Sequence, residues 1–324
     1  MKIGVISFAH MHAYSYAKVF RQMKDVEITA VTDEDEARGK HAAGNFDAVF
    51  YTSYEELLEQ NIDAVIVTSE NINHCKHVIA AAKAKKHVLV EKPMATTIED
   101  AEKMIRACKE NGVLLQVAYP VRFNTSIMQA KEQIDNGMIG DILAINATNR
   151  GKNPGGWFVV PEKSGGGAVM DHTVHVVDVI RWFMNSEVQE VYAEIDQLFH
   201  DQPIDDAGLL TLSFTNGVFA TLDCSWSKNK NFPSGADVTL EIIGTKGILS
   251  VDAFKQVLQV STVQDGEQQF GWGDSMNESL IRDFIRNISE EKEPVTSGYD
   301  GLKTVEVILA AYESAKKVQP MSIG

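Results

Sequence analysis

The chain has 324 residues, which at about 150 residues per domain predicts two domains in one polypeptide. Hydrophobic residues make up 44% of the chain and charged residues 23%, a composition typical of a folded protein with a sizeable core. The formal net charge of −15 disfavours general nucleic-acid binding and binding to anionic lipid, because both would be repelled.

The three cysteines lie far apart and form no CxxC pair. This spacing indicates neither a disulfide framework nor a zinc finger, and it suits a reducing compartment. The first nine residues are apolar but too short for the apolar core of a signal peptide. The apolar run at 307–312 is far shorter than the roughly 18 residues that a membrane span needs. We therefore expect a soluble, cytoplasmic protein.

Residues 1–120 alternate short apolar runs with stretches of helical periodicity. The apolar runs are continuous, which is typical of parallel strands buried on both faces of a sheet. Strands are predicted at residues 2–6, 27–32, 64–68, 87–90 and 114–117. Helices are predicted at residues 13–23, 55–60, 75–84 and 98–111. This order predicts a Rossmann-like, doubly wound α/β domain that ends near residue 120, where Ala118-Tyr119-Pro120 breaks the pattern.

Residues 121–324 predict an α+β domain. Helices at 127–136 and 169–183 flank a strand at 142–148 and a polar loop at 149–167. Twofold periodicity then predicts strands at residues 191–198, 207–214, 218–225 and 237–243. Two hairpin turns are predicted, at residues 215–217 and 244–247. We expect a mostly antiparallel sheet with helices on one side, closed by helices at 278–288 and 301–317.

The first strand is followed by a turn and a helix, where a dinucleotide-binding fold places its GxGxxG loop and the pyrophosphate. Ser7, Ala9 and His12 take the three glycine positions. Serine and alanine are small enough for the backbone to approach a phosphate, whereas His12 departs from the pattern. The loop alone fits equally well an α/β fold that binds no nucleotide. The candidate phosphate-loop residues are Ser7, Phe8, Ala9, His10, Met11 and His12.

Asp33 ends the second strand, at the spacing expected for the acid that binds the adenosine ribose, although a plain turn aspartate would look the same. It is followed by Glu34 and Asp35 rather than by a basic residue for a 2′-phosphate, which favours NAD over NADP. The carboxyl ends of parallel strands face the ligand crevice. The third strand therefore adds three candidates for contact with the cofactor: Thr68, Asn71 and His74.

The fourth strand ends in Glu91-Lys92-Pro93. This step presents an ammonium group to the same crevice, in a turn whose Lys–Pro peptide bond can be cis. A lone lysine is usually a surface charge, but one flanked by an apolar strand and a proline favours a functional role.

Asp171 and His175 lie four residues apart and share one helical face, with Asp178 next along it. A carboxylate that orients an imidazole suits proton transfer to or from an alcohol, although a capped helix with a satisfied histidine explains the same pattern. A metal site at His10, His12, His172 and His175 is also conceivable. No HExxH motif, cysteine cluster or dense carboxylate set accompanies these histidines, so we expect no metal.

Taken together, these residues resemble the glucose–fructose oxidoreductase and inositol dehydrogenase family (Gfo/Idh/MocA) over almost the whole chain. The most specific match is Glu91-Lys92-Pro93 at the end of its strand. Asp171 and His175 occupy the family's Asp-x-Gly-x-His motif, with Thr173 in place of the glycine. Further matches lie at residues 62–68, 121–123, 136–140, 165–168, 216–217, 225–226, 244–247, 300–302 and 311–315.

The resemblance implies a Rossmann domain at 1–120 joined to a substrate-binding α+β domain at 121–324, whose open sheet makes a homodimer or homotetramer contact. It implies hydride transfer between NAD and a sugar, polyol or keto-sugar, with Lys92, Asp171 and His175 as the catalytic group. Hydroxyl groups need polar partners, and a sugar ring can lie on an indole. Further substrate-binding candidates, which could equally be ordinary loop residues, are Arg122, Asn149, Lys152, Trp157 and His172.

Two other functions stay open. A relative that oxidises a sugar only transiently would catalyse elimination or glycoside cleavage with no net redox change. A nucleotide-binding sensor without turnover would account for the altered loop at Ser7, Ala9 and His12.

Overall fold

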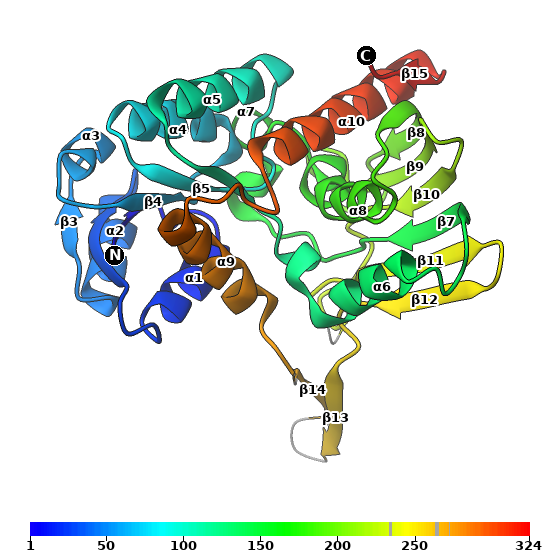
Figure 1. Ribbon diagram of the computed structural model, residues 1–324, viewed down its shortest axis with the longest axis horizontal. Coiled ribbons are helices and arrows are strands. Elements are labelled where there is room, and N and C mark those ends of the chain that lie inside the picture. The colour runs from blue at the N-terminus through cyan, green and yellow to red at the C-terminus, as the bar shows by residue number, and fades with distance from the viewer. Residues whose placement is uncertain (233–234, 263–265, 272) are drawn as a thin grey trace. The chain divides into compact units, whose positions relative to one another are not determined.

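The computed structural model describes residues 1–232, 235–262, 266–271 and 273–324 (Figure 1). It divides into two compact units. Unit 1 consists of residues 1–120, 162–165 and 277–305, and unit 2 consists of residues 121–161, 166–276 and 306–324. Within the described residues, no helix combines the length and the apolar character that crossing a bilayer requires.

Unit 1 is built on a parallel sheet with the strand order β3-β2-β1-β4-β5-β6. Its strands are β1 (Lys2–Ile6), β2 (Glu27–Thr32), β3 (Val49–Tyr51), β4 (Ala64–Val67), β5 (His87–Glu91) and β6 (Leu115–Ala118). The order reverses between β1 and β4, which is the switch point where such sheets bind ligands beyond the carboxyl ends of their strands. The predicted Rossmann-like fold is confirmed.

The helices of unit 1 cover this sheet (Figure 1). They are α1 (His12–Phe20), α2 (Glu36–Asn45), α3 (Tyr54–Leu58), η1 (Asn71–Asn73), α4 (His74–Lys83), α5 (Ile98–Asn111) and, from its second residue on, α9 (Met276–Glu290). The sequence analysis missed β3 and α2. Helix α2 buries small side chains and Gly39, where an added Cβ would lie 2.4 Å from the Phe50 ring, so it has no apolar stripe to reveal it.

Unit 2 is built on a sheet with the order β12-β11-β7-β10-β9-β8-β15. Its strands are β7 (Ile142–Thr148), β8 (Val188–Asp196), β9 (Ala207–Phe214), β10 (Phe219–Asp223), β11 (Thr239–Gly244), β12 (Ile248–Asp252) and β15 (Met321–Ser322). Strands β7 and β10 run parallel and the other neighbours antiparallel, which confirms the predicted, mostly antiparallel sheet. A separate antiparallel pair is formed by β13 (Val257–Thr262) and β14 (Gly266–Gly271).

Helices α6 (Thr125–Asp135) and α8 (Ala168–Met184) lie on one side of the unit 2 sheet (Figure 1). The last long helix, α10 (Gly298–Lys317), has its C-terminal part in unit 2. Both predicted hairpin turns are confirmed, between β9 and β10 and between β11 and β12. The predicted continuous loop at 149–167 is wrong in its second half, which forms η3 (Gly156–Val159) and α7 (Pro161–Ser164).

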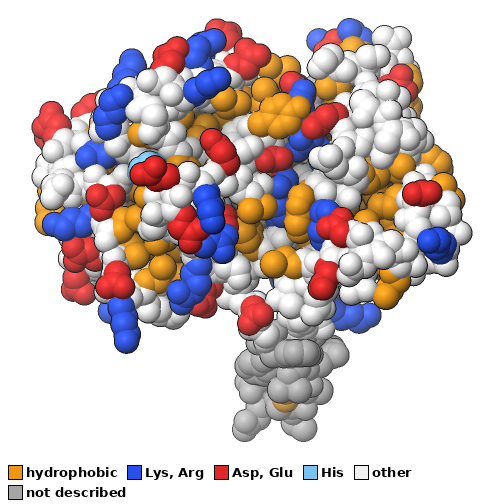
Figure 2. All heavy atoms as spheres, in the orientation of Figure 1, with side chains coloured by type: hydrophobic (Ala, Val, Ile, Leu, Met, Phe, Trp, Pro, Cys, Tyr) orange, Lys and Arg blue, Asp and Glu red, His pale blue; other side chains and the backbone are white. Residues whose placement is uncertain are grey.

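The surface of the protein mixes both signs of charge. On the face shown in Figure 2, acidic side chains are interspersed with those of Lys and Arg.

Candidate active site

The loop after β1 begins at Ser7, in the position of the first expected glycine. Its φ of 73° lies in the left-handed region that glycine adopts most easily. Ser7 is fully buried, its N–H donates to Thr32 O at 2.8 Å, and its hydroxyl accepts from Ala9 N at 3.2 Å. Serine thus keeps the sharp turn that the glycine would make, at a cost in backbone strain of about 1–3 kcal/mol.

The side chain of His10 accepts a hydrogen bond at the N-terminus of α1. Met11, the N-cap residue, makes no side-chain cap, and the His12 N–H donates instead to His10 Nδ1 at 3.2 Å. A histidine therefore satisfies one of the amides that a helix start leaves without an intrahelical acceptor. Met11 itself is 58% exposed.

Asp33 lies buried just beyond the end of β2. One carboxylate oxygen accepts from Phe8 N at 2.6 Å and from Arg38 Nε at 2.9 Å. The other accepts from Asp35 N at 2.8 Å and from Arg38 Nη2 at 2.6 Å. The expected ribose-binding acid is thus tied to the phosphate loop on one side and to a bidentate guanidinium on the other. The sequence analysis noted the acids after Asp33 but missed Arg38, because it did not predict α2.

The three polar candidates after β4 have different surroundings. The Thr68 hydroxyl donates to Ser7 O at 2.6 Å, which ties β4 to the phosphate loop. Asn71 Nδ2 donates to Ser164 O at 2.8 Å, in the short segment of unit 1 that follows residue 161. His74 is fully buried, with its ring nitrogens 3.0 Å from Pro93 O and 3.1 Å from Ser69 O. These two contacts link the end of β4 to the turn after β5, and burial lowers the pKa of His74.

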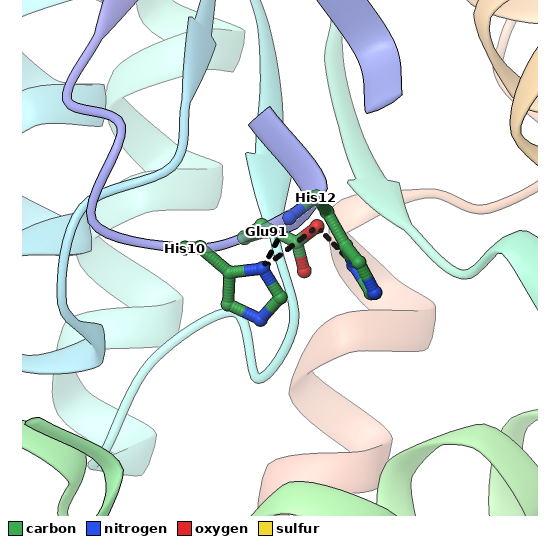
Figure 3. A group of neighbouring side chains, drawn as sticks. All are labelled: His10, His12 and Glu91. Atoms are coloured by element: carbon green, nitrogen blue, oxygen red, sulfur yellow. Dashed lines mark hydrogen bonds and ion pairs between the residues drawn. The ribbon is translucent and has the colours of Figure 1, made fainter. Parts of the chain in front are cut away.

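Glu91, the last residue of β5, is the centre of a buried polar network (Figure 3). Its Oε1 accepts from Tyr16 OH at 2.6 Å and lies 2.9 Å from His12 Nδ1, and its Oε2 accepts from Lys92 N at 2.9 Å. Burial opposes ionisation, but the charges of His10, His12 and Lys92 hold the pKa of Glu91 well below its ordinary value. The carboxylate beside Lys92 is therefore ionised.

Lys92 itself is buried, with 4% of its surface exposed. Its peptide bond to Pro93 is cis, in agreement with the turn that the sequence suggested. Tyr16, which the sequence analysis missed, lies one helical turn after His12 on α1. Burial and the neighbouring Glu91 carboxylate raise the pKa of Tyr16 well above its usual value, so its hydroxyl remains a hydrogen-bond donor.

The candidate residues of unit 2 lie on helix α8. Asp171 Oδ2 is 3.3 Å from His172 Nε2 and accepts from Trp226 Nε1, also at 3.3 Å. His172 Nδ1 lies 3.2 Å from Cys224 O. His175 is buried one turn further along the same face. Asp171 therefore has an imidazole and an indole beside it, and Trp226 is a neighbour that helical spacing could not reveal.

The start of α8 is fixed by Asp205, another residue that the sequence analysis missed. Its carboxylate accepts from Gly167 N at 2.8 Å and from Val169 N at 2.9 Å, and its third partner is Tyr312 OH at 2.9 Å. A Cβ on Gly167 would lie 1.9 Å from Asp205 O, so this position requires glycine. Asp205 lies 38 residues after Gly167, so no local capping signal pointed to it.

The remaining substrate-binding candidates have various partners in unit 2. Arg122 is buried and donates through Nε to Asp178 Oδ2 at 2.8 Å, with a second bond from Nη2 to Oδ1. Asn149 Nδ2 donates to Asp237 O at 2.9 Å. Trp157 stacks on Phe158, with ring centroids 3.9 Å apart. The backbone of Lys152, whose side chain is half-buried, donates to Gly235 O at 3.2 Å.

Together, the strand order of unit 1 and the polar residues at the carboxyl ends of β1, β2, β4 and β5 are typical of a dinucleotide-binding α/β fold. Residues 1–119 match the sequence profile described as "Oxidoreductase family, NAD-binding Rossmann fold", and residues 127–250 match that of the "GFO/IDH/MocA C-terminal domain". The protein belongs to the Gfo/Idh/MocA family of oxidoreductases, and its dinucleotide cofactor is NAD.

Individual relatives extend over most of the chain. The myo-inositol 2-dehydrogenase of Thermotoga maritima is 29% identical over 100% of this chain and 98% of its own length. The 2,7-anhydro-N-acetylneuraminate hydratase of Escherichia coli is 31% identical over 77% of this chain and 67% of its own length. The crystal structure of GenD2 from gentamicin A biosynthesis, in complex with NAD, superposes with a TM-score of 0.93 at 24% identity and covers 100% of this chain and 96% of its own. This last likeness shows the fold.

Proposed function

We propose that this protein is an NAD-dependent dehydrogenase or reductase that acts on a CH–OH group of a sugar, polyol or keto-sugar. The observation that carries the proposal is Lys92: a buried lysine beside an ionised glutamate, at the carboxyl end of β5 in an NAD-binding domain. The inositol dehydrogenase relative supports a polyol as substrate. In this assignment residues 1–120 bind the dinucleotide and residues 121–324 bind the substrate.

The residues of unit 1 fit the cofactor. Two features support this assignment: Ser7 has the left-handed backbone that glycine adopts in phosphate loops, and Asp33 follows β2 at the position expected for an acid that binds the adenosine ribose. We assign cofactor contacts to the residues named from the sequence, namely residues 7–12, Asp33, Thr68, Asn71, His74, Glu91 and Lys92. When bound, NAD supplies the nicotinamide carbon that accepts or returns a hydride.

Lys92, His175 and Asp171 share the proton and charge chemistry. His175 accepts the proton of the substrate hydroxyl as the alcohol is oxidised, because a neutral imidazole is the general base best matched to neutral pH. The Lys92 ammonium stabilises the negative charge that grows on the oxygen. We assign to Asp171 the role of holding Lys92 and His175 in register; its oxygen Oδ2 lies 3.3 Å from Nε2 of the neighbouring His172. In the reverse direction the same residues protonate a reduced ketone.

A substrate screen tests the function. Myo-inositol, other polyols and aldoses are each incubated with the protein and NAD or NADP, and absorbance of the reduced nicotinamide is followed. We expect net NADH production from at least one of them and a loss of about a hundredfold or more with Lys92→Ala, because a positioned electrostatic group is removed. Lys76→Ala, which removes an exposed lysine from α4, is the matched control. Equal rates in both variants would contradict the assignment of Lys92.

A redox-neutral reaction is the second candidate, because the 31% identical relative is a hydratase. In that case the hydride taken from the substrate is returned, and product forms without net NADH. Mass spectrometry of the reaction mixture, showing loss or gain of water at constant NADH, would identify it. A nucleotide-binding sensor would bind NAD in a calorimetric titration and change no substrate in either assay.

We further propose that the protein is a cytoplasmic homodimer or homotetramer that associates through the open face of the unit 2 sheet. Leu209 on β9, Phe219 on β10 and Ile248 on β12 are 59%, 56% and 61% exposed. Leu209 and Phe219 alternate along their strands with buried residues. Large apolar side chains on one sheet face are typical of a protein contact. Light scattering after chromatography should show an oligomer that Phe219→Glu dissociates, and a monomeric wild type would overturn the proposal.

A further inference from the structure

Three side chains with metal-ligand atoms converge in unit 1 (Figure 3). His10 comes from the loop after β1, His12 is the first residue of α1, and Glu91 is the last residue of β5. Glu91 lies 79 residues after His12 in the chain. The sequence analysis expected no metal because no HExxH motif, cysteine cluster or dense carboxylate set accompanies the histidines, whereas the fold brings the carboxylate of Glu91 to His10 and His12.

The ligand atoms lie close enough for one ion. His12 Nδ1 is 2.9 Å and His10 Nδ1 is 3.9 Å from Glu91 Oε1, and the ligand atoms of the three residues all lie within 4.8 Å of one another. Around a tetrahedral ion with bonds of about 2.1 Å, neighbouring ligand atoms are about 3.4 Å apart. The observed spacing brackets that value, so small rotations of the side chains would complete the geometry, and His10 Nδ1 would exchange the hydrogen bond from His12 N for the ion.

The donor set selects the kind of ion. Two imidazoles and one carboxylate form the ligand set of many zinc sites that keep a fourth position open, whereas calcium and magnesium prefer oxygen ligands throughout. Glu91 is also held by outer hydrogen bonds, from Tyr16 OH to Oε1 at 2.6 Å and from Lys92 N to Oε2 at 2.9 Å. Such partners fix the orientation of a ligand and strengthen the site.

We propose that His10, His12 and Glu91 bind one divalent transition-metal ion, with zinc(II) as the best fit, and that the protein leaves one coordination position open. This goes beyond the proposed function, in which hydride transfer with NAD needs no metal. Without an ion, the same contacts form a hydrogen-bonded network in which His12 donates to Glu91. Stoichiometric metal binding by the wild-type protein distinguishes a metal site from a cluster that is only a hydrogen-bonded network.

Metal-free protein, without nucleotide, is titrated with zinc(II) by calorimetry and with cobalt(II) by visible absorption. We expect one ion per chain and the intense visible bands of four-coordinate cobalt(II). His10→Ala, His12→Ala and Glu91→Gln should each weaken zinc(II) binding by more than about a hundredfold, since each removes a ligand. Tyr16→Phe should weaken it by about 10- to 100-fold, since it removes an outer hydrogen bond.

His41→Ala, which removes an exposed histidine from α2, is the matched control and should bind zinc(II) as the wild type does. His12 is the decisive position because its side chain is 27% exposed, so its replacement disturbs packing less than replacement of His10 or Glu91, whose side chains are 3% and 0% exposed. Absence of stoichiometric binding by the wild type would overturn the proposal. So would equal affinity in a folded His12→Ala protein.

Discussion

The two units hold their candidate residues in different ways. In unit 1 these residues follow the carboxyl ends of parallel strands, as Asp33 follows β2 and Lys92 follows β5. In unit 2 they lie along one helix, where Asp171, His175 and Asp178 share a face. The end of a parallel strand therefore predicts at which edge of the sheet a polar side chain lies. A shared helical face predicts less, because residues on it can have different partners. Asp178 forms a buried ion pair with Arg122, whereas Asp171 lies beside His172 and Trp226.

The largest effect should come from His175, which tests whether the α8 face carries chemistry. His175→Ala should lower turnover on the substrate found in the screen by about 10²- to 10⁴-fold, the range for loss of a general base. Affinity for NADH should change little, because this side chain has no assigned contact with the dinucleotide. His41→Ala, exposed on α2, is the control. If the residue is structural instead, the melting temperature falls while turnover per folded molecule is retained.

The next largest effect concerns Arg122, which the sequence offered as a substrate contact and the structure pairs with Asp178. Arg122→Ala should lower the free energy of unfolding by about 3–5 kcal/mol, because it leaves a buried carboxylate without its guanidinium. Arg282→Ala, which breaks an exposed pair with Glu278, should cost at most about 1 kcal/mol. Urea unfolding measures both.

The double variant Arg122→Met/Asp178→Leu should recover most of the lost stability, since it removes both charges together. If Arg122→Ala is as stable as the wild type, and its KM is raised for the substrate but not for NAD, Arg122 is a substrate contact and this prediction is wrong.

The sequence predicted the strands of unit 1 well because continuous apolar runs are strong signals, and β1 and β2 agree with prediction at both ends. It missed α2, whose buried residues are glycine and alanine, and with α2 it missed Arg38. Contacts between distant parts of the chain were also invisible: Glu91 with His12, and Asp205 with Gly167. The assignments of Lys92, Asp171 and His175 rest on family motifs and stay predictions, because local patterns do not specify a chemical role.

A smaller, pH-dependent effect is expected from His77 in unit 1. Burial lowers the pKa of His77 from 6.5 to about 3, and its Nδ1 is 3.0 Å from Ser69 Oγ. The unfolded chain binds a proton that the folded chain does not, so stability falls as pH drops from about 6.5 towards 3. Between pH 7 and pH 5 this histidine should lower the free energy of unfolding by about 2 kcal/mol.

Denaturant titrations at the two pH values, with His77→Gln beside the wild type, measure this contribution as a difference in pH dependence. His41→Gln serves as an exposed control. Glu34 Oε1 lies 3.5 Å from His77 Nε2 and would favour the charged imidazole. If that attraction outweighed burial, the wild type would gain stability relative to His77→Gln as the pH falls, which is the opposite sign.

The smallest effect concerns Arg38, which pairs with Asp33 beyond the end of β2 and should influence the choice between NADH and NADPH. Its guanidinium is 30% exposed and holds both oxygens of Asp33, so this strand end presents a paired charge rather than a bare carboxylate. A 2′-phosphate would be repelled by Asp33 and attracted by Arg38, so the arginine moderates the preference for NAD. Arg38→Ala should raise the ratio of NADH to NADPH affinity by about tenfold, equivalent to about 1.4 kcal/mol.

Fluorescence titration of both cofactors measures the ratio, with the exposed Arg21→Ala as control. A ratio that stays constant, or moves towards NADPH, would show that the guanidinium has no part in cofactor choice.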